Sequence, residues 1–117
     1  MDDDTIAALS TPPGRGGIAV IRVSGEKTRQ ILKKIVEHLP AEIVPRKAYH
    51  SFVVEGKKRV DECVVIYFKA PRSYTGEDLT EISIHSNPFL IERVLELIYK
   101  NQVRDALPGE FTYRAFK

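Results

Sequence analysis

The order of strand-like and helix-like segments constrains the fold of this 117-residue chain most strongly. Short β-branched or alternating segments predict strands, and segments with apolar residues at helical spacing predict amphipathic helices. The resulting order ββαβββαβα lacks the regular βαβ alternation of a doubly wound fold. The sequence therefore predicts a single α+β domain, with a mixed or antiparallel sheet of about five strands and two to three helices. The expected strands lie at 5–9, 18–23, 47–54, 61–68 and 79–85, with an edge strand at 103–107, and the expected helices lie at 26–39, from 88 onward and after 110.

Several local signals support these boundaries. Asn87 is a favourable N-cap and Pro88 a favourable first helical residue, whereas Pro40 is expected to end the first helix. The run Cys63–Phe68 is apolar without a break, which is typical of a central strand covered on both faces. Gly56 lies between two strand-like segments and indicates a hairpin.

Composition excludes several classes of protein. The formal net charge is only +2, which argues against a dedicated nucleic-acid-binding domain. One cysteine excludes an internal disulfide framework and a cysteine-based zinc site, and it fits a reducing compartment. No apolar run approaches the ~18 residues of a membrane span, and the acidic start Met1-Asp2-Asp3-Asp4 is unlike a secretory leader. We therefore expect a cytoplasmic domain with no membrane contact.

The chain also lacks the motifs of the common catalytic sites. No Gly-x-x-x-x-Gly-Lys-Ser/Thr string is present, so this chain alone is predicted not to hydrolyse nucleotides and to be non-catalytic. The spacing of His38, His50 and His85 fits no metal site. Cys63 lies in an apolar strand and is expected to be an inert, buried thiol.

Arg22 and Glu81 are the strongest candidate site residues, because each interrupts an otherwise apolar or β-branched strand. Such residues pair with each other, face solvent or bind a ligand. A carboxylate suits a planar heterocycle with adjacent N–H donors, such as a pterin or a guanine, and an arginine suits a carboxylate or a carbonyl. His85 follows Glu81 on the same strand face and is a candidate neighbour.

Two further groups of residues leave alternatives open. Tyr67, Phe68 and Tyr74 are either core residues or a stacking platform. Lys57-Lys58-Arg59 is either a solvated hairpin tip or an RNA contact.

Three separated motifs, taken together, resemble the N-terminal domain of the tRNA-modification GTPases of the MnmE (TrmE) family. The resemblance begins near the N-terminus and extends to the last residues of the chain. Its motifs are Asp4-Thr5-Ile6-Ala7-Ala8 with Thr11-Pro12-Pro13-Gly14-Arg15-Gly16-Gly17-Ile18 and Ile21-Arg22-Val23-Ser24-Gly25, then Pro71-Arg72-Ser73-Tyr74-Thr75-Gly76-Glu77-Asp78 with Glu81-Ile82, then Pro108-Gly109-Glu110-Phe111-Thr112 with Arg114-Ala115-Phe116.

The resemblance implies that residues 1–117 are a folate-binding and dimerisation domain. Its fold would be similar to the tetrahydrofolate-binding domain of aminomethyltransferase-type proteins. The ligand would be 5-formyltetrahydrofolate or another tetrahydrofolate derivative, and the family's folate-contacting arginine and glutamate match Arg22 and Glu81. The loops Thr11–Gly17 and Lys69–Asp78 are expected to shape the pocket or the contact between two copies of the homodimer.

The resemblance also implies a longer protein. The full-length family adds a helical domain and a potassium-dependent GTPase domain that uses GTP and Mg²⁺. With an FAD-containing partner, MnmG (GidA), it modifies the wobble uridine of certain tRNAs. Because the last helix has barely begun at Lys117, we expect this sequence to be a fragment in which the helical and GTPase domains are absent.

Two departures from the family pattern keep other functions open. Where the family reads His-Gly-Gly, this chain has His85-Ser86-Asn87, and the family's Asn-Gly-Lys-x-Asp-Leu segment, with a folate-contacting lysine, lies beyond Lys117. One alternative is a free-standing aminomethyltransferase-like enzyme with Glu81 or His85 as general base. The other is a dimerisation-only domain whose folate site has decayed.

Overall fold

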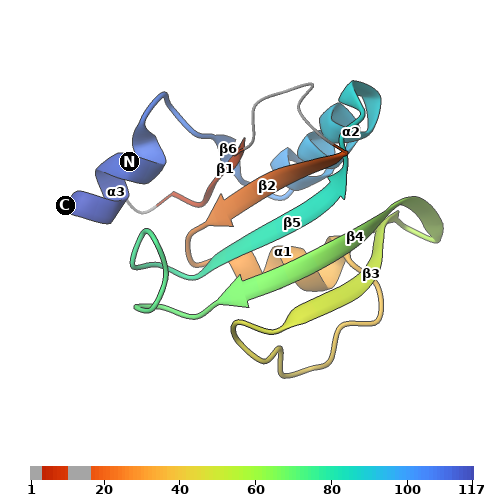
Figure 1. The fold of residues 1–117 in the computed structure, drawn as a ribbon, viewed down its shortest axis with the longest axis horizontal. Helices are drawn as coiled ribbons and strands as arrows, with labels where there is room; N and C mark the ends of the chain where they lie inside the picture. Colours follow the sequence, from red (N-terminus) through yellow and green to blue (C-terminus); the bar gives the residue numbers. More distant parts are fainter. Residues whose placement is uncertain (1–3, 11–16) are drawn as a thin grey trace.

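A computed structural model describes residues 4–10 and 17–117, so most of the expected Thr11–Gly17 loop lies outside the described residues. The described chain forms one sheet and three helices (Figure 1). Its elements are β1 (Ile6–Leu9), β2 (Ile18–Ser24), α1 (Thr28–Ile35), β3 (Ala48–Glu55), β4 (Lys58–Phe68), β5 (Leu79–His85), α2 (Pro88–Tyr99), β6 (Arg104–Asp105) and α3 (Glu110–Phe116).

The sheet has six strands in the order β3-β4-β5-β2-β1-β6. Neighbouring strands are antiparallel except β1 and β6, which pair in parallel through Ile6 and Arg104 and through Ala7 and Asp105. This confirms the predicted single α+β domain with a mixed sheet. The segment expected as an edge strand is the edge strand β6, although only two of its residues pair.

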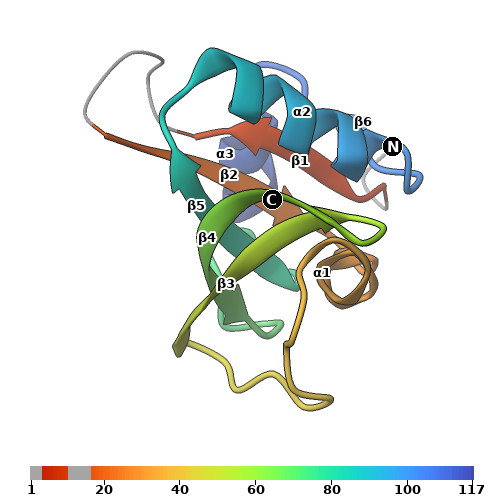
Figure 2. The same ribbon diagram turned by 90° about the vertical axis from the view of Figure 1, so that its right-hand side faces the viewer.

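Helices α1 and α2 cover the same face of the sheet, as Figure 2 shows. Their apolar sides supply most of the helical part of the core, because the residues at helical spacing point toward the strands. The buried residues include Ile31, Leu32 and Ile35 of α1, Ile91, Val94 and Ile98 of α2, and Ala19, Ile21, Val23, Val53, Val65 and Ile82 of the strands.

Within residues 4–10 and 17–117, no helix covers the opposite face of the sheet (Figure 2). This corrects the prediction that β4 is covered on both faces. Cys63, Val65 and Tyr67 are buried, but the alternate residue Val64 is 36% exposed and Phe68 is only partly buried. The unbroken apolar run therefore belongs to a strand with one buried face and one apolar face that is still open.

The first helix is shorter than predicted, since α1 ends at Ile35 and not near Leu39. Beyond it, Val36 forms an antiparallel bridge with Val53, and the Glu37 amide donates to the Phe52 carbonyl at 3.1 Å. The chain therefore leaves the helix to pair with β3, well before Pro40 is reached.

The other predicted signals agree with the structure. β3 and β4 form the expected hairpin, and both strands extend up to a two-residue turn at Gly56. Asn87 caps α2, because its side chain accepts hydrogen bonds from the amides of Phe89 and Leu90 at 2.9 and 3.2 Å. α3 lies beside the loop between β4 and β5 (Figure 1). Among the described residues, no helix is long and apolar enough to cross a membrane.

Candidate functional site

Arg22 and Glu81, on the open face of the sheet, form an ion pair. β2 and β5 are antiparallel, with these two residues directly opposite each other. The Nε of Arg22 donates to Oε2 of Glu81 at 3.0 Å, and Nη2 lies 3.0 Å from the same oxygen. The side chains remain 33% and 25% exposed. Of the alternatives that the sequence left open, the mutual pair is present, and solvent still reaches both partners.

The loop between β4 and β5 places an aromatic ring beside this pair. The guanidinium carbon of Arg22 lies 5.7 Å from the centroid of the Tyr74 ring, which is 50% exposed. The Tyr74 hydroxyl lies 3.3 Å from Oγ1 of Thr112 in α3. Of the three aromatic residues with two open interpretations, Tyr67 is buried in the core and Phe68 is partly buried on the open face. Only Tyr74 stands next to Arg22.

A cavity of about 380 Å³ adjoins Arg22 on the side of β1 and α3. Residues 8–10 and 106–112 form the rest of its lining. Small-molecule sites occupy about 300–1,000 Å³, so this hollow is large enough for a heterocyclic ring. The cavity, the ion pair and the exposed ring together form the candidate site.

A network of charged residues fixes α3 to the loop that carries Tyr74. Arg114, whose side chain is 0% exposed, donates through Nη1 to Oε1 of Glu77 at 2.9 Å. The same oxygen accepts from the hydroxyl of Ser24 at 2.7 Å, and that hydroxyl lies 2.7 Å from Oγ1 of Thr75. From the sequence, Thr75 and Glu77 have an expected role only as part of the loop Lys69–Asp78, and Ser24 and Arg114 have none. The signal that pointed to them is their place in the quoted motifs, since Thr75, Glu77 and Arg114 belong to the second and third.

Glu110, at the start of α3, joins the same network. Its carboxylate accepts two hydrogen bonds from Arg104, at 2.8 and 2.5 Å, and one from Nη2 of Arg114 at 3.2 Å. The bonds from Arg104 are the main reason that the pKa of Glu110 falls to about 2, and the Leu107 amide adds to the effect.

His85, the candidate neighbour of Glu81, lies elsewhere on the open face. The two residues are four positions apart on an extended strand, a separation of about 13 Å. The Nδ1 atom of His85 lies 3.0 Å from Oδ1 of Asp61, and the Asp61 carboxylate also accepts from the His85 amide at 3.0 Å. His85 lines a different cavity, of about 170 Å³, together with Ile18 and Val64. The structure therefore brings Arg22 and Glu81 together and leaves His85 apart.

Ser86 and Asn87, the two positions at which the sequence analysis expects a departure from the family pattern, connect β5 to α2. The Ser86 amide donates to the Gly17 carbonyl at 2.9 Å, and Asn87 caps α2. Neither residue lines the cavity beside Arg22. Their contacts hold the end of β5 against the start of β2.

Thiol and metal chemistry find little support in the described residues. Cys63 is buried, and burial raises the pKa of its thiol to about 12, so the reactive thiolate is scarce. Across residues 4–10 and 17–117, no group of three or more His, Cys, Asp or Glu side chains could hold a metal ion.

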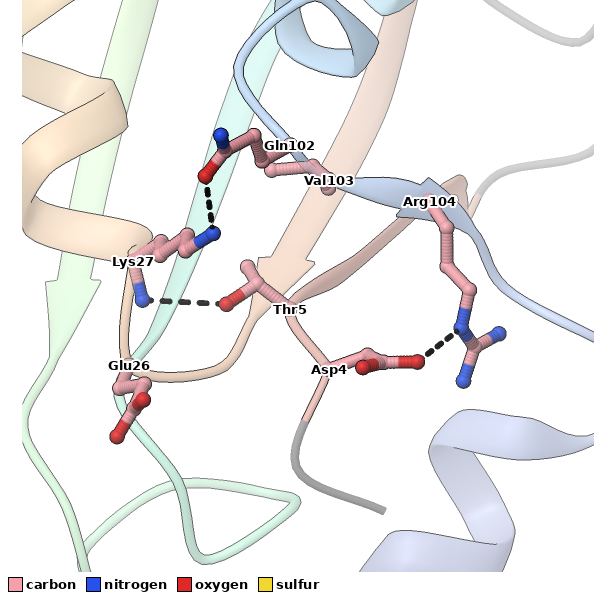
Figure 3. A pocket seen from close by; sticks show the side chains of 7 residues that line it. All are labelled: Asp4, Thr5, Glu26, Lys27, Gln102, Val103 and Arg104. Carbon is pink, nitrogen blue, oxygen red and sulfur yellow. Dashed lines mark hydrogen bonds and ion pairs between the residues drawn. The ribbon is translucent and has the colours of Figure 1, made fainter. Parts of the chain in front are cut away.

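A further cavity, of about 480 Å³, lies where β1, α1 and β6 meet (Figure 3). Most of its polar side chains contact one another, whereas Glu26 points away from the rest (Figure 3). Lys27 donates from Nζ to Gln102 at 2.7 Å and from its amide to Thr5 at 3.1 Å, and Arg104 donates to Asp4 at 2.9 Å (Figure 3). These contacts join three separated segments of the chain, so we interpret this cavity as structural.

Comparison with known proteins identifies a family. A family model described as "GTP-binding protein TrmE N-terminus" matches residues 5–117. The chain is 50% identical over 115 residues to the tRNA modification GTPase MnmE of Thermotoga petrophila, which covers 97% of this chain and 25% of that protein. It is 50% identical over 117 residues to the protein of the same name from Endomicrobium trichonymphae, covering 99% and 25%. It is 47% identical over 118 residues to that of Roseiflexus castenholzii, again covering 99% and 25%.

The chain thus spans about a quarter of the length of these relatives. The match extends from β1 to the end of α3 and includes every residue of the candidate site, from Ala8 to Thr112. At this coverage and identity, the chain belongs to the TrmE N-terminal family.

Proposed function

We propose that this chain is the tetrahydrofolate-binding and homodimerisation module of a tRNA-modification GTPase. The observation that carries the folate proposal is the solvent-accessible Arg22–Glu81 pair beside an empty cavity of about 380 Å³. The ligand is 5-formyltetrahydrofolate or a related tetrahydrofolate. The expectation that the loop Thr11–Gly17 shapes the pocket or the contact between two copies falls, except for Gly17, outside the described residues.

The geometry of the pair suits a pterin. Arg22 contacts Glu81 through Oε2. Within residues 4–10 and 17–117, the other oxygen, Oε1, has no hydrogen-bond partner. An ionised carboxylate is an acceptor only, so Oε1 accepts from the adjacent N–H donors of the pterin. The two contacts from Arg22 orient the carboxylate, and Tyr74 offers an exposed ring for stacking.

The wider role concerns the whole protein, of which this chain is a module. The curated relatives are named tRNA modification GTPases. We propose that the module delivers a folate-borne one-carbon unit to modification of the wobble uridine of tRNA, in the cytoplasm. GTP, Mg²⁺ and K⁺ would act at a separate GTPase domain, and the FAD-containing partner MnmG (GidA) and tRNA would bind the full-length protein.

Calorimetric titration of 5-formyltetrahydrofolate into this chain tests the folate site. We expect Glu81→Gln to weaken binding at least about tenfold, because it replaces one acceptor oxygen with a donor and removes the charge that holds Arg22. Arg22→Gln should weaken binding as well. The matched controls are Glu55→Gln and Arg93→Gln. They break a comparable ion pair, in which Nη2 of Arg93 lies 2.6 Å from Oε1 of Glu55, and neither residue lines the cavity.

The control variants should bind as the wild type does. Unchanged affinity in Glu81→Gln would disprove the site. A folded dimer that binds no folate would instead favour the dimerisation-only alternative.

A further inference from the structure

Three basic side chains, Arg46, Lys69 and Arg72, line one cavity of about 310 Å³. The backbone brings them together from both sides of the β3–β4 hairpin. The Arg46 amide donates to the Tyr67 carbonyl at 2.7 Å, which holds the segment before β3 against the end of β4. The Arg72 amide donates to the Lys69 carbonyl at 2.9 Å and closes a turn just beyond β4. The cavity is thus built by fixed backbone contacts.

The charged side chains that line this cavity are all basic. In the part of the chain that the structure describes, none of these three side chains forms an ion pair. By contrast, Arg22, Arg59, Arg93 and Arg104 each contact a carboxylate. Asp78, a nearby acid, accepts from the Ala70 amide at 2.9 Å and lines a separate cavity with Glu26 and Glu77. Cations gathered in a hollow without a counter-charge favour an anionic ligand.

The basic cavity lies near the Arg22–Glu81 pair. Glu81 stands opposite Ile66 on β4, and Phe68 follows on the same face, about 7 Å farther along the strand. The guanidinium of Arg46 lies 5.9 Å from the centroid of the Phe68 ring. The pterin and aminobenzoyl groups of a folate lie in line, and together they are long enough to reach from Glu81 to this cavity.

The Arg22–Glu81 pair cannot bind both ends of a folate at once. Arg22 and Glu81 touch each other at 3.0 Å, whereas the pterin and the terminal carboxylates of a folate lie at opposite ends of an extended molecule. If Glu81 accepts from the pterin, Arg22 is at the pterin end too. A second cationic site is then needed for the tail.

We propose that Arg46, Lys69 and Arg72 bind the carboxylates of the γ-linked glutamyl tail, so that this domain prefers polyglutamylated folates. This inference rests on the proposed folate site at Arg22 and Glu81. Each added glutamate brings one more carboxylate within reach of these cations. Because exposed pairs contribute about 0.2–1 kcal/mol each, three of them give roughly a tenfold gain in affinity.

The test compares 5-formyltetrahydrofolate carrying a monoglutamyl or a pentaglutamyl tail, titrated into the chain at low salt. The wild type should bind the pentaglutamyl form roughly tenfold more tightly, and the difference should shrink as salt rises. The triple variant Arg46→Gln, Lys69→Gln, Arg72→Gln should bind both forms alike. The matched control Lys34→Gln, Lys57→Gln, Lys58→Gln removes the same charge from exposed positions outside the cavity and should keep the preference.

The outcomes distinguish a failure of the tail site alone from a failure of the folate site. If the wild type binds both forms equally and Glu81→Gln abolishes that binding, the tail site is wrong and the folate site stands. If neither form binds, both proposals fail. A single-stranded RNA oligonucleotide serves as the phosphate-only probe. RNA binding that the triple variant loses, without any dependence on tail length, would overturn the tail site in favour of a nucleic-acid phosphate site.

Discussion

Among single residues, Glu110 is the clearest case of an ionised side chain that stabilises the folded state. Hydrogen bonds from Arg104, and a smaller contribution from Arg114, hold its pKa at about 2, below the ordinary value of 4.5. A carboxyl group with a lowered pKa stabilises the fold fully at a pH above its unfolded value. That stabilisation is lost as the pH falls from about 4.5 through 2.

We therefore expect Glu110→Gln to lower the free energy of unfolding by about 2 kcal/mol at pH 7. The difference from the wild type should shrink below pH 4.5 and vanish near pH 2. Urea denaturation at a series of pH values measures it, with the exposed Glu92→Gln as the control. A difference that stays constant down to pH 2 would mean that the carboxylate of Glu110 is not the stabilising group.

Arg22 and Glu81 can be singled out from the sequence, but the residues that surround them in the fold cannot. A charge within an apolar strand stands out in a sequence, because few chains place one there without a partner or a ligand. Arg114 and Glu77 lie in polar segments, where charged residues are ordinary. Only the folded chain brings them together, across 37 positions and with Arg114 fully buried. Their role depends on tertiary contact, which no local pattern encodes.

At the scale of elements, the junction between β2 and α1 depends on one glycine. Gly25 has φ +137° and donates from its amide to the Asp78 carbonyl at 2.9 Å. A Cβ built there would lie 2.5 Å from Oγ1 and 2.6 Å from Cα of Thr5. Thr5, just before β1, therefore packs so closely against this turn that a side chain has no room.

We expect Gly25→Ala to lower the free energy of unfolding by roughly 3 kcal/mol, because the clash and the unfavourable φ add. Gly56→Ala is the matched variant, since Gly56 also has a positive φ (+62°) but no atom within 4 Å of its Cβ position. It should cost only about 1 kcal/mol, the penalty of the left-handed backbone alone. Urea midpoints of the two proteins provide the comparison. Equal losses would show that contact with Thr5 is not the cause.

Most helices and strands could be predicted from the spacing of apolar residues. The incorrect predictions lie where tertiary contacts compete with that spacing. The apolar spacing of α1 continues past Ile35, yet Val36 and Glu37 gain pairing with β3 that a longer helix would forfeit. Strand ends were predicted to within about three residues, the usual uncertainty of boundaries. The apolar run of β4 was interpreted as evidence for two covering layers, but the described chain supplies only one.

At the scale of the whole molecule, the face of the sheet opposite α1 and α2 is the main surface that the described residues leave uncovered. Ile18 is 60% exposed and Val64 is 36% exposed, and both line the cavity of about 170 Å³ beside His85. Exposed apolar side chains gathered on one surface mark an interaction site. The proposed homodimer provides an occupant, because a second copy would bring an equally apolar face to cover them. The face also carries Arg22 and Glu81, so the folate site would lie next to the contact.

We therefore expect the chain to have twice its 13.3 kDa mass in solution, and Ile18→Glu with Val64→Glu to yield a monomer. Two carboxylates on each facing surface would be desolvated and mutually repelled, whereas they remain hydrated on a single copy. Analytical ultracentrifugation gives the mass, and circular dichroism checks that the variant is folded. Phe89→Glu, at a 74% exposed position on α2, is the control and should leave the dimer intact. A dimer that survives the double substitution would place the contact elsewhere, and a monomeric wild type would remove homodimerisation from the function of this chain.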